Sequence, residues 1–425
     1  MPDVHRTIEA VWRIESTRVI ASVARMVGDV GLAEDFAQDA LLAALERWPK
    51  SGVPDNPGAW LMATAQRRAI DMLRQRTLHA SKEAAVAHEV AAQFAAAAAD
   101  VDAALDDHIG DDVLRLMFTA CHPVLSTEAR VALTLRLLGG LTTTEIARAF
   151  LLPEPTIAQR IVRAKRTLAE ARVPFEVPAP TELPARLASV LEVVYLIFNE
   201  GYAATAGEDW MRPELCHDAA RLGRILAELM PQEGEVHGLV ALMELQASRL
   251  RARTNAQGEP VLLLDQDRSR WDQLLIQRGL AALQRALEVG GALRPYTLQA
   301  AIAACHARAR SAEEIDWPRI AALYDALAQL MPSPVVELNR AVAIGMAFGP
   351  AAGLQAADAL REEPLLKNYH LLPAVRADLL WKLERFAEAA AEFERAAALT
   401  GNRREKELLG ARAAACAAGV AYRAG

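Results

Sequence analysis

The sequence predicts an all-α protein, and three observations carry that prediction. Apolar residues recur at spacings of three and four along nearly the whole chain, whereas the alternation typical of strands is almost absent. Of the 425 residues, 52% are hydrophobic and 24% are charged, which is a globular composition with enough apolar side chains for two or three domains. Proline-rich and Ala/Asp-rich stretches separate the periodic segments and indicate linkers.

Composition divides the chain into three helical blocks and two linkers. The first block has amphipathic stretches over 4–27, 32–48 and 57–77, with the loop KSGVPDNP between the last two. The first linker is Ala-rich and carries six Asp from Asp100 to Asp112 without a Lys or Arg. The predicted segments are 1–80 (first block), 81–112 (acidic linker), 113–173 (second block), 174–184 (proline-dense spacer) and 185–425 (third block).

The second block contains two short helices joined by a tight turn. Thr142 followed by Glu145 is a capping box, so the first of these helices begins at Thr142. It ends near Phe150, and the next begins near Glu154, because Pro155 is tolerated only in a first helical turn. Two helices with a short turn are the outline of a helix-turn-helix.

The second helix of this pair has one apolar and one polar face. The apolar stripe is formed by Ile157, Ile161, Ala164 and Leu168. The polar face carries Thr156, Gln159, Arg160 and Arg163, with Lys165 and Arg166 beside it. Such a mixture can read base edges in the major groove of DNA and hold the neighbouring phosphates. An ordinary exposed face of an Arg-rich helical protein remains the alternative at this point.

A second basic helix is predicted in the first block, over PGAWLMATAQRRAIDMLRQRT. Its basic residues are Arg67, Arg68, Arg74 and Arg76, against the single acid Asp71. Its apolar stripe is Leu61, Ala65, Ala69 and Leu73. Two basic helices joined by an acidic linker predict a protein that holds one DNA at two places, and a solvated Arg-rich surface is again the alternative.

Charge and cysteine usage exclude several other classes. A net charge of −7 and a pI near 5.8 confine any DNA-binding surface to local basic patches. Four scattered cysteines without a Cys-x-x-Cys motif indicate neither a disulfide framework nor a zinc site, and we expect Cys121-His122 to be core packing. No leader and no apolar run of about 18 residues is found. We therefore expect a cytoplasmic protein with no membrane partner, no cofactor and no metal.

Three stretches, in order, resemble the extracytoplasmic-function sigma factors of the sigma-70 family. They are GLAEDFAQDALLAALERW, NPGAWLMATAQRRAIDMLR and LTTTEIARAFLLPEPTIAQRIVRAKRTL, and the resemblance covers roughly residues 5–172. It implies a sigma region 2 domain in the first block and a sigma region 4 helix-turn-helix in the second. The implied partners are promoter DNA and core RNA polymerase, through the clamp of its largest subunit and through its flap.

The resemblance also implies a role for individual residues. Those expected to contact the polymerase clamp are Asp35, Gln38, Asp39 and Leu42. Those expected to melt and hold the promoter's minus-10 element are Lys50 to Asn56, Trp60, Gln66, Arg67, Arg68 and Arg74. Those expected to contact the minus-35 element are Thr156, Gln159, Arg160, Arg163, Lys165 and Arg166. The linker would run through polymerase, where its six Asp could occupy a basic channel before RNA arrives.

Four positions depart from the family pattern. Arg67 stands where members usually have Asn, and Pro153 stands at the usual Ser or Thr cap of the recognition helix. Leu151 replaces the usual glycine of the turn, and Pro155 replaces another small residue. These departures bear on the contacts to individual bases more than on the fold.

The third block contains degenerate internal repeats. LQAAIA at Leu298 recurs as LNRAVA at Leu338, and GPAAGLQAADAL at Gly349 is echoed by RFAEAAAEFERAAAL at Arg385. Spacings of 40 and 36 residues predict stacked helical hairpins similar to tetratricopeptide repeats. The chain thus resembles a sigma-factor subgroup with a C-terminal tetratricopeptide-like extension, which is thought to control activity in place of an anti-sigma factor. A concave surface for a peptide or protein partner is implied.

One loop of the third block, over 252–271, has a dense charged cluster. Its members are Asp265, Asp267, Arg268 and Arg270, next to Trp271. An interdomain contact with the sigma domains and a self-contained salt-bridged loop both fit this pattern. Neither this cluster nor Glu200 has a nucleophile, metal pair or phosphate loop beside it in the sequence, so we expect no enzymatic activity.

Together these features predict a sigma factor that recruits core RNA polymerase, with a regulatory repeat domain fused behind it. One alternative is a stand-alone helix-turn-helix regulator with a repeat-based sensor, which leaves 30–76 unexplained. Another is a scaffold in which the repeats act and the front half is a relic, which the intact basic helices argue against.

Overall fold

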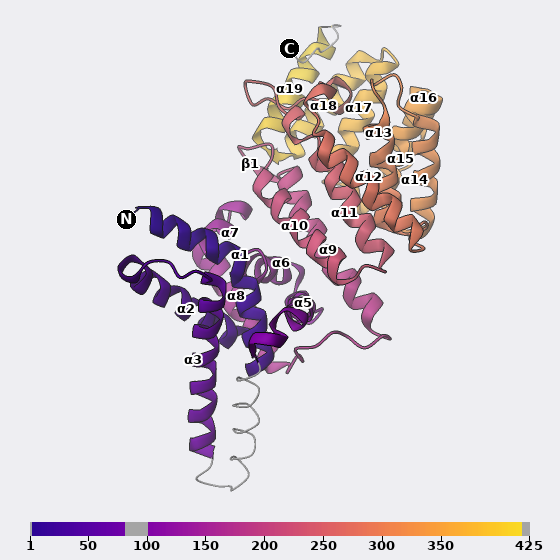
Figure 1. Ribbon diagram of the computed structural model, residues 1–425. Coiled ribbons are helices and arrows are strands. Elements are labelled where there is room, and N and C mark those ends of the chain that lie inside the picture. The colour runs from indigo at the N-terminus through magenta and orange to yellow at the C-terminus, as the bar shows by residue number, and fades with distance from the viewer. Residues whose placement is uncertain (1, 81–100, 419–425) are drawn as a thin grey trace. The chain divides into compact units, whose positions relative to one another are not determined.

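The computed structural model describes residues 2–80 and 101–418 and is almost entirely helical there (Figure 1). The described strands are two short segments of two residues each, so the predicted all-α class is confirmed. The chain divides into two compact units, Met1–Val194 and Tyr195–Gly425. Positions 81–100 of the predicted acidic linker lie outside the described residues.

The first predicted block forms three packed helices. These are α1 (Pro2–Val27), α2 (Val30–Ser51) and α3 (Pro57–Ala80). The Asp29 carboxylate caps α2 by accepting hydrogen bonds from the amides of Gly31 and Leu32, and α2 ends at Gly52, whose φ of 86° suits glycine. Lys50 lies in the last turn of α2, so the expectation that it belongs to the loop was wrong at this position.

Three of the four residues of the apolar stripe predicted for α3 lie in the core of this block, and the fourth, Leu73, is half-buried. Leu61, Ala65 and Ala69 are buried, and Trp48 of α2 meets Trp60 of α3 edge to face with 5.4 Å between ring centroids. Trp48 is fully buried, whereas Trp60 is partly exposed. The tryptophan pair therefore fixes α3 against α2 while one ring stays at the surface.

The second predicted block forms four helices. They are α5 (Val101–Ala120), α6 (Thr127–Leu137), α7 (Thr143–Phe150) and α8 (Glu154–Glu170). Because α5 begins at Val101, the last part of the predicted linker is helical. Asp112, the last of the six linker aspartates, is 1% exposed and bonds Arg25 of α1 at 2.9 Å and Arg115 at 2.6 Å. The Asp112 carboxylate thus forms its ion pairs within the first unit.

The helix-turn-helix matches the sequence-based prediction closely. Both hydrogen bonds of the capping box between Thr142 and Glu145 are present. The four residues of α8 that are buried are the four predicted ones, Ile157, Ile161, Ala164 and Leu168. Leu151, in the turn, has φ 51° and ψ 40°, a left-handed conformation that favours glycine. No side chain caps α8, since Pro153 occupies the cap position.

The division between the two units falls inside α9 (Leu183–Tyr202), not in the proline-dense spacer. The first part of α9 packs on the second block. Arg186 donates to the carbonyl of Phe118 at 2.9 Å, and the Ser189 hydroxyl donates to the carbonyl of Cys121 at 2.6 Å. The predicted boundary at residue 185 therefore lies ten positions before the division that the structure shows.

The C-terminal unit is built from helices that pack on their neighbours in the chain (Figure 1). They are α10 (Pro213–Leu229), α11 (Gly234–Ala247), α12 (Gln273–Glu288), α13 (Pro295–Arg308), α14 (Trp317–Leu330), α15 (Pro334–Phe348), α16 (Pro350–Asp358), α17 (Leu371–Lys382), α18 (Phe386–Leu399) and α19 (Arg403–Ala417), with four 3-10 turns, η1 (Leu250–Ala252), η2 (Leu263–Asp265), η3 (Arg268–Arg270) and η4 (Pro364–Leu366). The sequence repeats fall at equivalent places: the first pair on α13 and α15, the second on α16 and α18. Helical hairpin repeats are thereby confirmed.

The unit's first and last segments are joined by a minimal sheet. Strands β1 (Ala206–Gly207) and β2 (Gly401–Asn402) pair in parallel. Asn402 is 2% exposed, and its side-chain amide donates to the carbonyls of Ala204 and Asp209 while its oxygen caps α19. One side chain thus links residues nearly 200 positions apart in the sequence.

Candidate nucleic-acid and polymerase interfaces

The outward face of α8 carries polar side chains beside a groove. This groove has a volume of about 380 Å³ and lies between α8 and the start of α6. Four predicted minus-35 residues line it: Thr156, Gln159, Arg160 and Arg163. Within the described residues neither arginine makes an ion pair. Ser126, the cap of α6, and Ala129 line the opposite wall, and the Ser126 hydroxyl accepts a hydrogen bond from the amide of Ala129.

The two flanking basic residues are placed differently from these four. The Lys165 ammonium lies 2.5 Å from a carboxylate oxygen of Glu34 in α2, and its side chain is only 19% exposed. Arg166 is exposed and pairs with Glu170 one turn later at 3.0 Å. In this conformation Lys165 is therefore used to hold α8 to the first block, and Arg160 and Arg163 are free for phosphates or bases.

Glu34 is a buried carboxylate with partners on three sides. It is 3% exposed, accepts a hydrogen bond from Gln38 at 2.7 Å, and pairs with Lys165 and with Arg136 of α6, each at 2.5 Å. Burial alone would raise the pKa of Glu34, but the positive charges of Lys165 and Arg136 hold the pKa below its ordinary value. The carboxylate therefore stays ionised and joins the first block to the second.

The predicted minus-10 residues form a mixed surface along α3 and the loop before it. Lys50, Asn56 and Arg67 are exposed, and the Asn56 side chain accepts a hydrogen bond from the amide of Ala59 at the start of α3. Arg74 lies 3.8 Å from Asp71. The others are engaged inside the block: Gln66 donates to Ser22 at 3.2 Å, Trp60 packs on Trp48, and Arg68 pairs with Asp39 at 2.6 Å.

The predicted polymerase-binding residues share one side of α2. Asp35 is exposed, and the Leu42 side chain is 56% exposed, which is high for a large apolar residue. Asp39 lies between them and carries the ion pair with Arg68. Gln38 instead turns its amide to Glu34. The Asp39–Arg68 ion pair therefore links a residue predicted to bind polymerase with a residue predicted to bind the minus-10 element.

Sequence reasoning missed the contacts that join the two sigma blocks. Besides Glu34 and Asp112, the capping residue Glu145 accepts a hydrogen bond from Arg13 of α1 at 3.1 Å, and the Thr17 hydroxyl donates to the carbonyl of Leu138. The partners are about 120 to 130 positions apart in the sequence. No local spacing pattern signals such pairs.

The charged cluster of the third block is largely engaged within the C-terminal unit. Trp271 is 4% exposed in an apolar core, and Arg268 donates to the carbonyls of His306 and Ala309. Arg270 donates to the carbonyl of Thr254, and Asp267 caps η3 through Ser269. A self-contained loop therefore accounts for Arg268 and Trp271, and the interdomain contact remains a prediction for the exposed Asp267 and Arg270.

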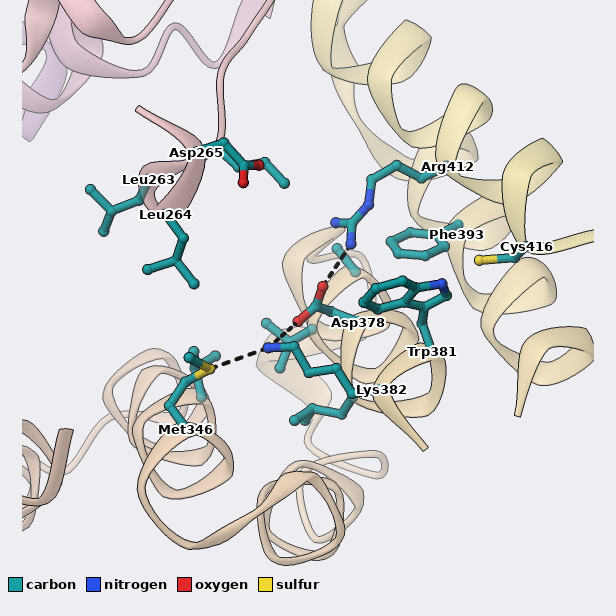
Figure 2. A pocket seen from close by; sticks show the side chains of 15 residues that line it. Leu263, Leu264, Asp265, Met346, Asp378, Trp381, Lys382, Phe393, Arg412 and Cys416 are labelled. Atoms are coloured by element: carbon teal, nitrogen blue, oxygen red, sulfur yellow. Dashed lines mark hydrogen bonds and ion pairs between the residues drawn. The ribbon is translucent and has the colours of Figure 1, made fainter. Parts of the chain in front are cut away.

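A second pocket lies in the C-terminal unit and is shown in Figure 2. Its volume is about 410 Å³, and Leu263 and Leu264 of η2 lie across from Trp381 of α17. Asp378 in its wall pairs with Lys382 at 3.1 Å and with Arg412 of α19 at 2.6 Å. The pocket thus combines apolar walls with one charged cluster whose members already bind one another.

Residues 2–80 and 101–418 contain no group of three or more His, Cys, Asp or Glu side chains placed to hold a metal ion. Cys121 is buried and hydrogen-bonded to Thr134, as core packing predicts, and burial raises its pKa to about 11. None of the described helices combines the length and apolar character that a membrane crossing requires.

Comparison with known proteins agrees with this architecture. Residues 13–78 match sigma-70 region 2, residues 115–168 match sigma-70 region 4, and residues 186–287 match a family of unknown function, DUF6596. The two sigma-70 matches include most of the two basic helices, α3 and α8. They define the class of protein: a sigma factor, which directs RNA polymerase to promoters. The stand-alone regulator is not favoured, because region 2 is matched as well as the helix-turn-helix.

Individual relatives narrow the class. An uncharacterized protein of Rhizobium meliloti is 42% identical over 91% of this chain and 90% of its own length. The ECF RNA polymerase sigma factor SigK of Mycobacterium sp. is 31% identical over 36% of this chain and 76% of its own length. A Mycobacterium tuberculosis protein named "Probable ECF RNA polymerase sigma factor SigI" is 30% identical over 40% of this chain, which spans 57% of that relative. No solved structure matches significantly.

The chain belongs to the extracytoplasmic-function RNA polymerase sigma factors. The matches to sigma-70 regions 2 and 4 end at residue 168, before the C-terminal unit, and the similarity to SigK covers 36% of the chain. The relative that shares nearly the whole chain carries no assigned function.

Proposed function

We propose that the two sigma regions divide promoter recognition as their surfaces suggest. The groove face of α8 contacts the minus-35 element, and the loop before α3, with the exposed arginines of α3, melts and holds the minus-10 element. The exposed side of α2 at Asp35, Asp39 and Leu42 binds the clamp of the polymerase's largest subunit, and region 4 binds the flap. The chain itself performs no chemical step.

The observation that carries the minus-35 proposal is that Arg160 and Arg163 both line the groove and make no ion pair with another described residue. Arginine supplies bidentate hydrogen bonds to guanine and to phosphate. Both arginines line a groove together with Gln159 and Thr156, the side-chain types that read adenine edges and bind phosphates.

Binding to a promoter requires the two sigma regions to separate. Through the Glu34–Lys165 pair α8 contacts α2, and α2 packs on α3. Neighbouring helix axes are about 8–10 Å apart, which places α8 and α3 within roughly 20 Å of each other. The two promoter elements are nominally about 25 base pairs apart, or roughly 85 Å of B-DNA at about 3.4 Å per pair. The Glu34 contacts therefore belong to a closed state that opens before the DNA is bound at both elements.

The decisive experiment is run-off transcription with purified bacterial core polymerase on a fragmented genomic library. New transcripts with defined starts are expected when the full chain is added. Replacing Leu42 with Asp should abolish them without altering DNA binding by region 4, because it places a charge in an apolar contact. A protein that shifts duplex DNA alone but gives no transcript would contradict the assigned division of roles.

For the C-terminal unit we propose control of this sigma activity through a peptide or protein partner. Helical hairpin arrays present surfaces for such partners, and the pocket at Trp381 and Asp378 offers an open apolar wall with a charged end. A chain ending after Tyr202 keeps all of α9, whose first turns complete the sigma unit. Run-off transcription with this shortened chain gives the sign of control: higher output indicates restraint, lower output indicates activation, and unchanged output contradicts the proposal.

A further inference from the structure

Three arginines of the C-terminal unit lie close together without acidic partners. We call Arg249, Arg253 and Arg268 the arginine cluster. Arg249 and Arg253 are each 7% exposed, and Arg268 is half-buried. In the part of the chain that the structure describes, none of the three forms an ion pair. A buried guanidinium without a carboxylate is rare, because the loss of hydration is strongly unfavourable.

Aromatic rings surround the arginine cluster and bring its members together. The Arg253 guanidinium carbon lies 3.6 Å from the centre of the Tyr202 ring, and that of Arg268 lies 4.5 Å from the Trp271 ring. The Arg249 guanidinium lies between these two rings, 5.8 Å from each. Ring faces attract cations, but they supply no hydrogen-bond acceptor in the plane of the guanidinium, which is where its N–H groups point. The neutral side chains of Tyr202 and Gln246 supply one hydrogen bond each, to Arg253 and to Arg249.

Several hydrogen-bond donors around the cluster are left over. The Nε of Arg249, one Nη of Arg268 and the Nε1 of Trp271 are buried and have no hydrogen-bond partner among the described residues. The Nδ1 of His306 is likewise unpartnered. Among the described residues, the unpartnered atoms of the same segment also include the Gln266 side-chain oxygen, and the Nδ1 of the neutral His306 is a donor or an acceptor according to the tautomer. Buried polar groups nearly always have a hydrogen-bond partner. The unpartnered donors therefore indicate a binding site for a group that is rich in hydrogen-bond acceptors.

The pKa values of neighbouring groups are lowered by burial and by the positive charge of the cluster. Burial, followed by Arg249 and Arg268, lowers the pKa of His306 to about 4, so the imidazole stays neutral and adds no further charge. Burial first, and then repulsion from Arg249, lowers the pKa of Arg268. The arginines themselves remain charged at neutral pH, since no shift of ordinary size deprotonates a guanidinium.

We propose that the arginine cluster binds a small oxyanion, a phosphate or carboxylate group, held by the guanidinium groups and the Trp271 indole N–H. Oxyanions supply negative charge and several acceptor oxygens at once, and guanidinium groups match their geometry in bidentate fashion. The low exposure of Arg249 and Arg253 favours a small ion or a single anionic group over an extended chain. Arg249, Arg253, Arg268, Trp271 and Tyr202 all fall within residues 186–287, the segment that matches the family of unknown function.

The test is isothermal titration calorimetry on the full chain with sodium phosphate and, separately, sodium acetate. Sodium chloride at equal ionic strength is the reference. A saturable one-site isotherm is expected for at least one oxyanion, and the preference between phosphate and acetate identifies the anionic group. Thermal unfolding should give a rise in Tm of about 5 °C at 100 times the Kd.

The matched variants are Arg249→Gln and Arg251→Gln. Arg251 lies between the two buried arginines in the sequence, but it is exposed and forms no ion pair within residues 2–80 and 101–418. Arg249→Gln should weaken binding at least about tenfold, as expected for the loss of one charged hydrogen-bond partner, whereas Arg251→Gln should bind like the parent. This comparison also removes the general stabilising effect of phosphate on proteins. If Arg249→Gln fails to fold by circular dichroism, Arg268→Lys provides the second measurement, with the same expected loss.

Either of two results would overturn the proposal. One is the absence of saturable binding for both oxyanions; the other is an equal response of Arg249→Gln and Arg251→Gln. In both cases the arginine cluster is a structural element held by its aromatic rings and by its hydrogen bonds to Gln246, His306 and Ala309. Because neither measurement uses polymerase or DNA, failure here leaves the promoter-binding proposal untouched.

Discussion

The sigma unit and the C-terminal unit place unpaired arginines in opposite environments. In the sigma unit, Arg160 and Arg163 lie on the outer face of α8, and the buried charges Glu34 and Asp112 each have two cationic partners. In the C-terminal unit, Arg249 and Arg253 are buried and form no ion pair with another described residue. Exposed unpaired arginines cost the fold little and suit a large external polyanion such as DNA. Buried unpaired arginines suit a small anion that completes the interior.

The largest expected effect is on Arg160 and Arg163, which line the groove beside α8. Each base or phosphate contact of this kind contributes about 1–3 kcal/mol, so Arg160→Ala with Arg163→Ala should remove about 4 kcal/mol, or roughly a thousandfold in transcription from a minus-35-dependent promoter. The Tm should stay within about 1 °C, because neither side chain is paired. Run-off transcription and thermal unfolding measure the two quantities, with the exposed Arg361→Ala as control. A fall in Tm that matches the lost activity would contradict the comparison.

The next largest effect is expected for the buried, paired charge. Glu34→Gln should lower the free energy of unfolding of the sigma unit by about 3 kcal/mol, because Lys165 and Arg136 lose their carboxylate partner. The neighbouring Asp35→Asn, at an exposed position, is the matched control and should change it by less than about 0.5 kcal/mol. Urea unfolding followed by circular dichroism provides the measurement.

The pH dependence of the same pair has a defined sign. The pKa of Glu34 is lower in the folded state than its ordinary value of about 4.3. Its stabilising contribution is therefore present above that ordinary value and is lost as the pH falls through the folded-state pKa. The parent should lose stability relative to Glu34→Gln on acidification below about pH 4, and parallel acid unfolding curves would exclude the assigned role of Glu34.

A smaller effect is expected from the strained turn of the helix-turn-helix. Leu151 has a left-handed backbone conformation and is 52% exposed, so Leu151→Gly relieves strain and loses little burial. A gain of about 1 kcal/mol in the free energy of unfolding is expected. Leu151→Ala keeps the strain and serves as the control in urea unfolding. Equal values for the two variants would show that the turn is not strained.

The smallest effect is expected from Arg249→Gln in a buffer free of oxyanions. The variant loses ring contacts and its hydrogen bond to Gln246, but it also removes an unpaired buried charge, and these effects oppose each other. The free energy of unfolding should change by less than about 1 kcal/mol. A loss above about 2 kcal/mol in chemical denaturation would show that Arg249 stabilises the fold without a bound anion. The contrast between the arginines of the two units would then not hold.

Local sequence rules predicted the helix-turn-helix in detail. The capping box at Thr142 and Glu145 and the four buried residues of α8 are present as predicted, because capping and helical periodicity act within one or two turns. The end of α2 was predicted less well. Proline usually breaks a helix, yet Pro49 lies within α2 and Lys50 in its last turn, since the helix continues to Ser51 before Gly52 ends it.

The sequence by itself determined the helical class, the order of the blocks and the polar face of α8, because each depends on residues adjacent along the chain. Only the tertiary structure decided which charges are free. Lys165 and Arg163 are two positions apart on one basic helix, yet Lys165 pairs with Glu34 and Arg163 lines an open groove. Likewise Arg249 and Arg253 are buried while Arg251 between them is exposed. Whether an ionised side chain contacts a carboxylate, an aromatic ring or solvent depends on helices from distant parts of the chain. The packing of their apolar faces determines which of these helices are neighbours.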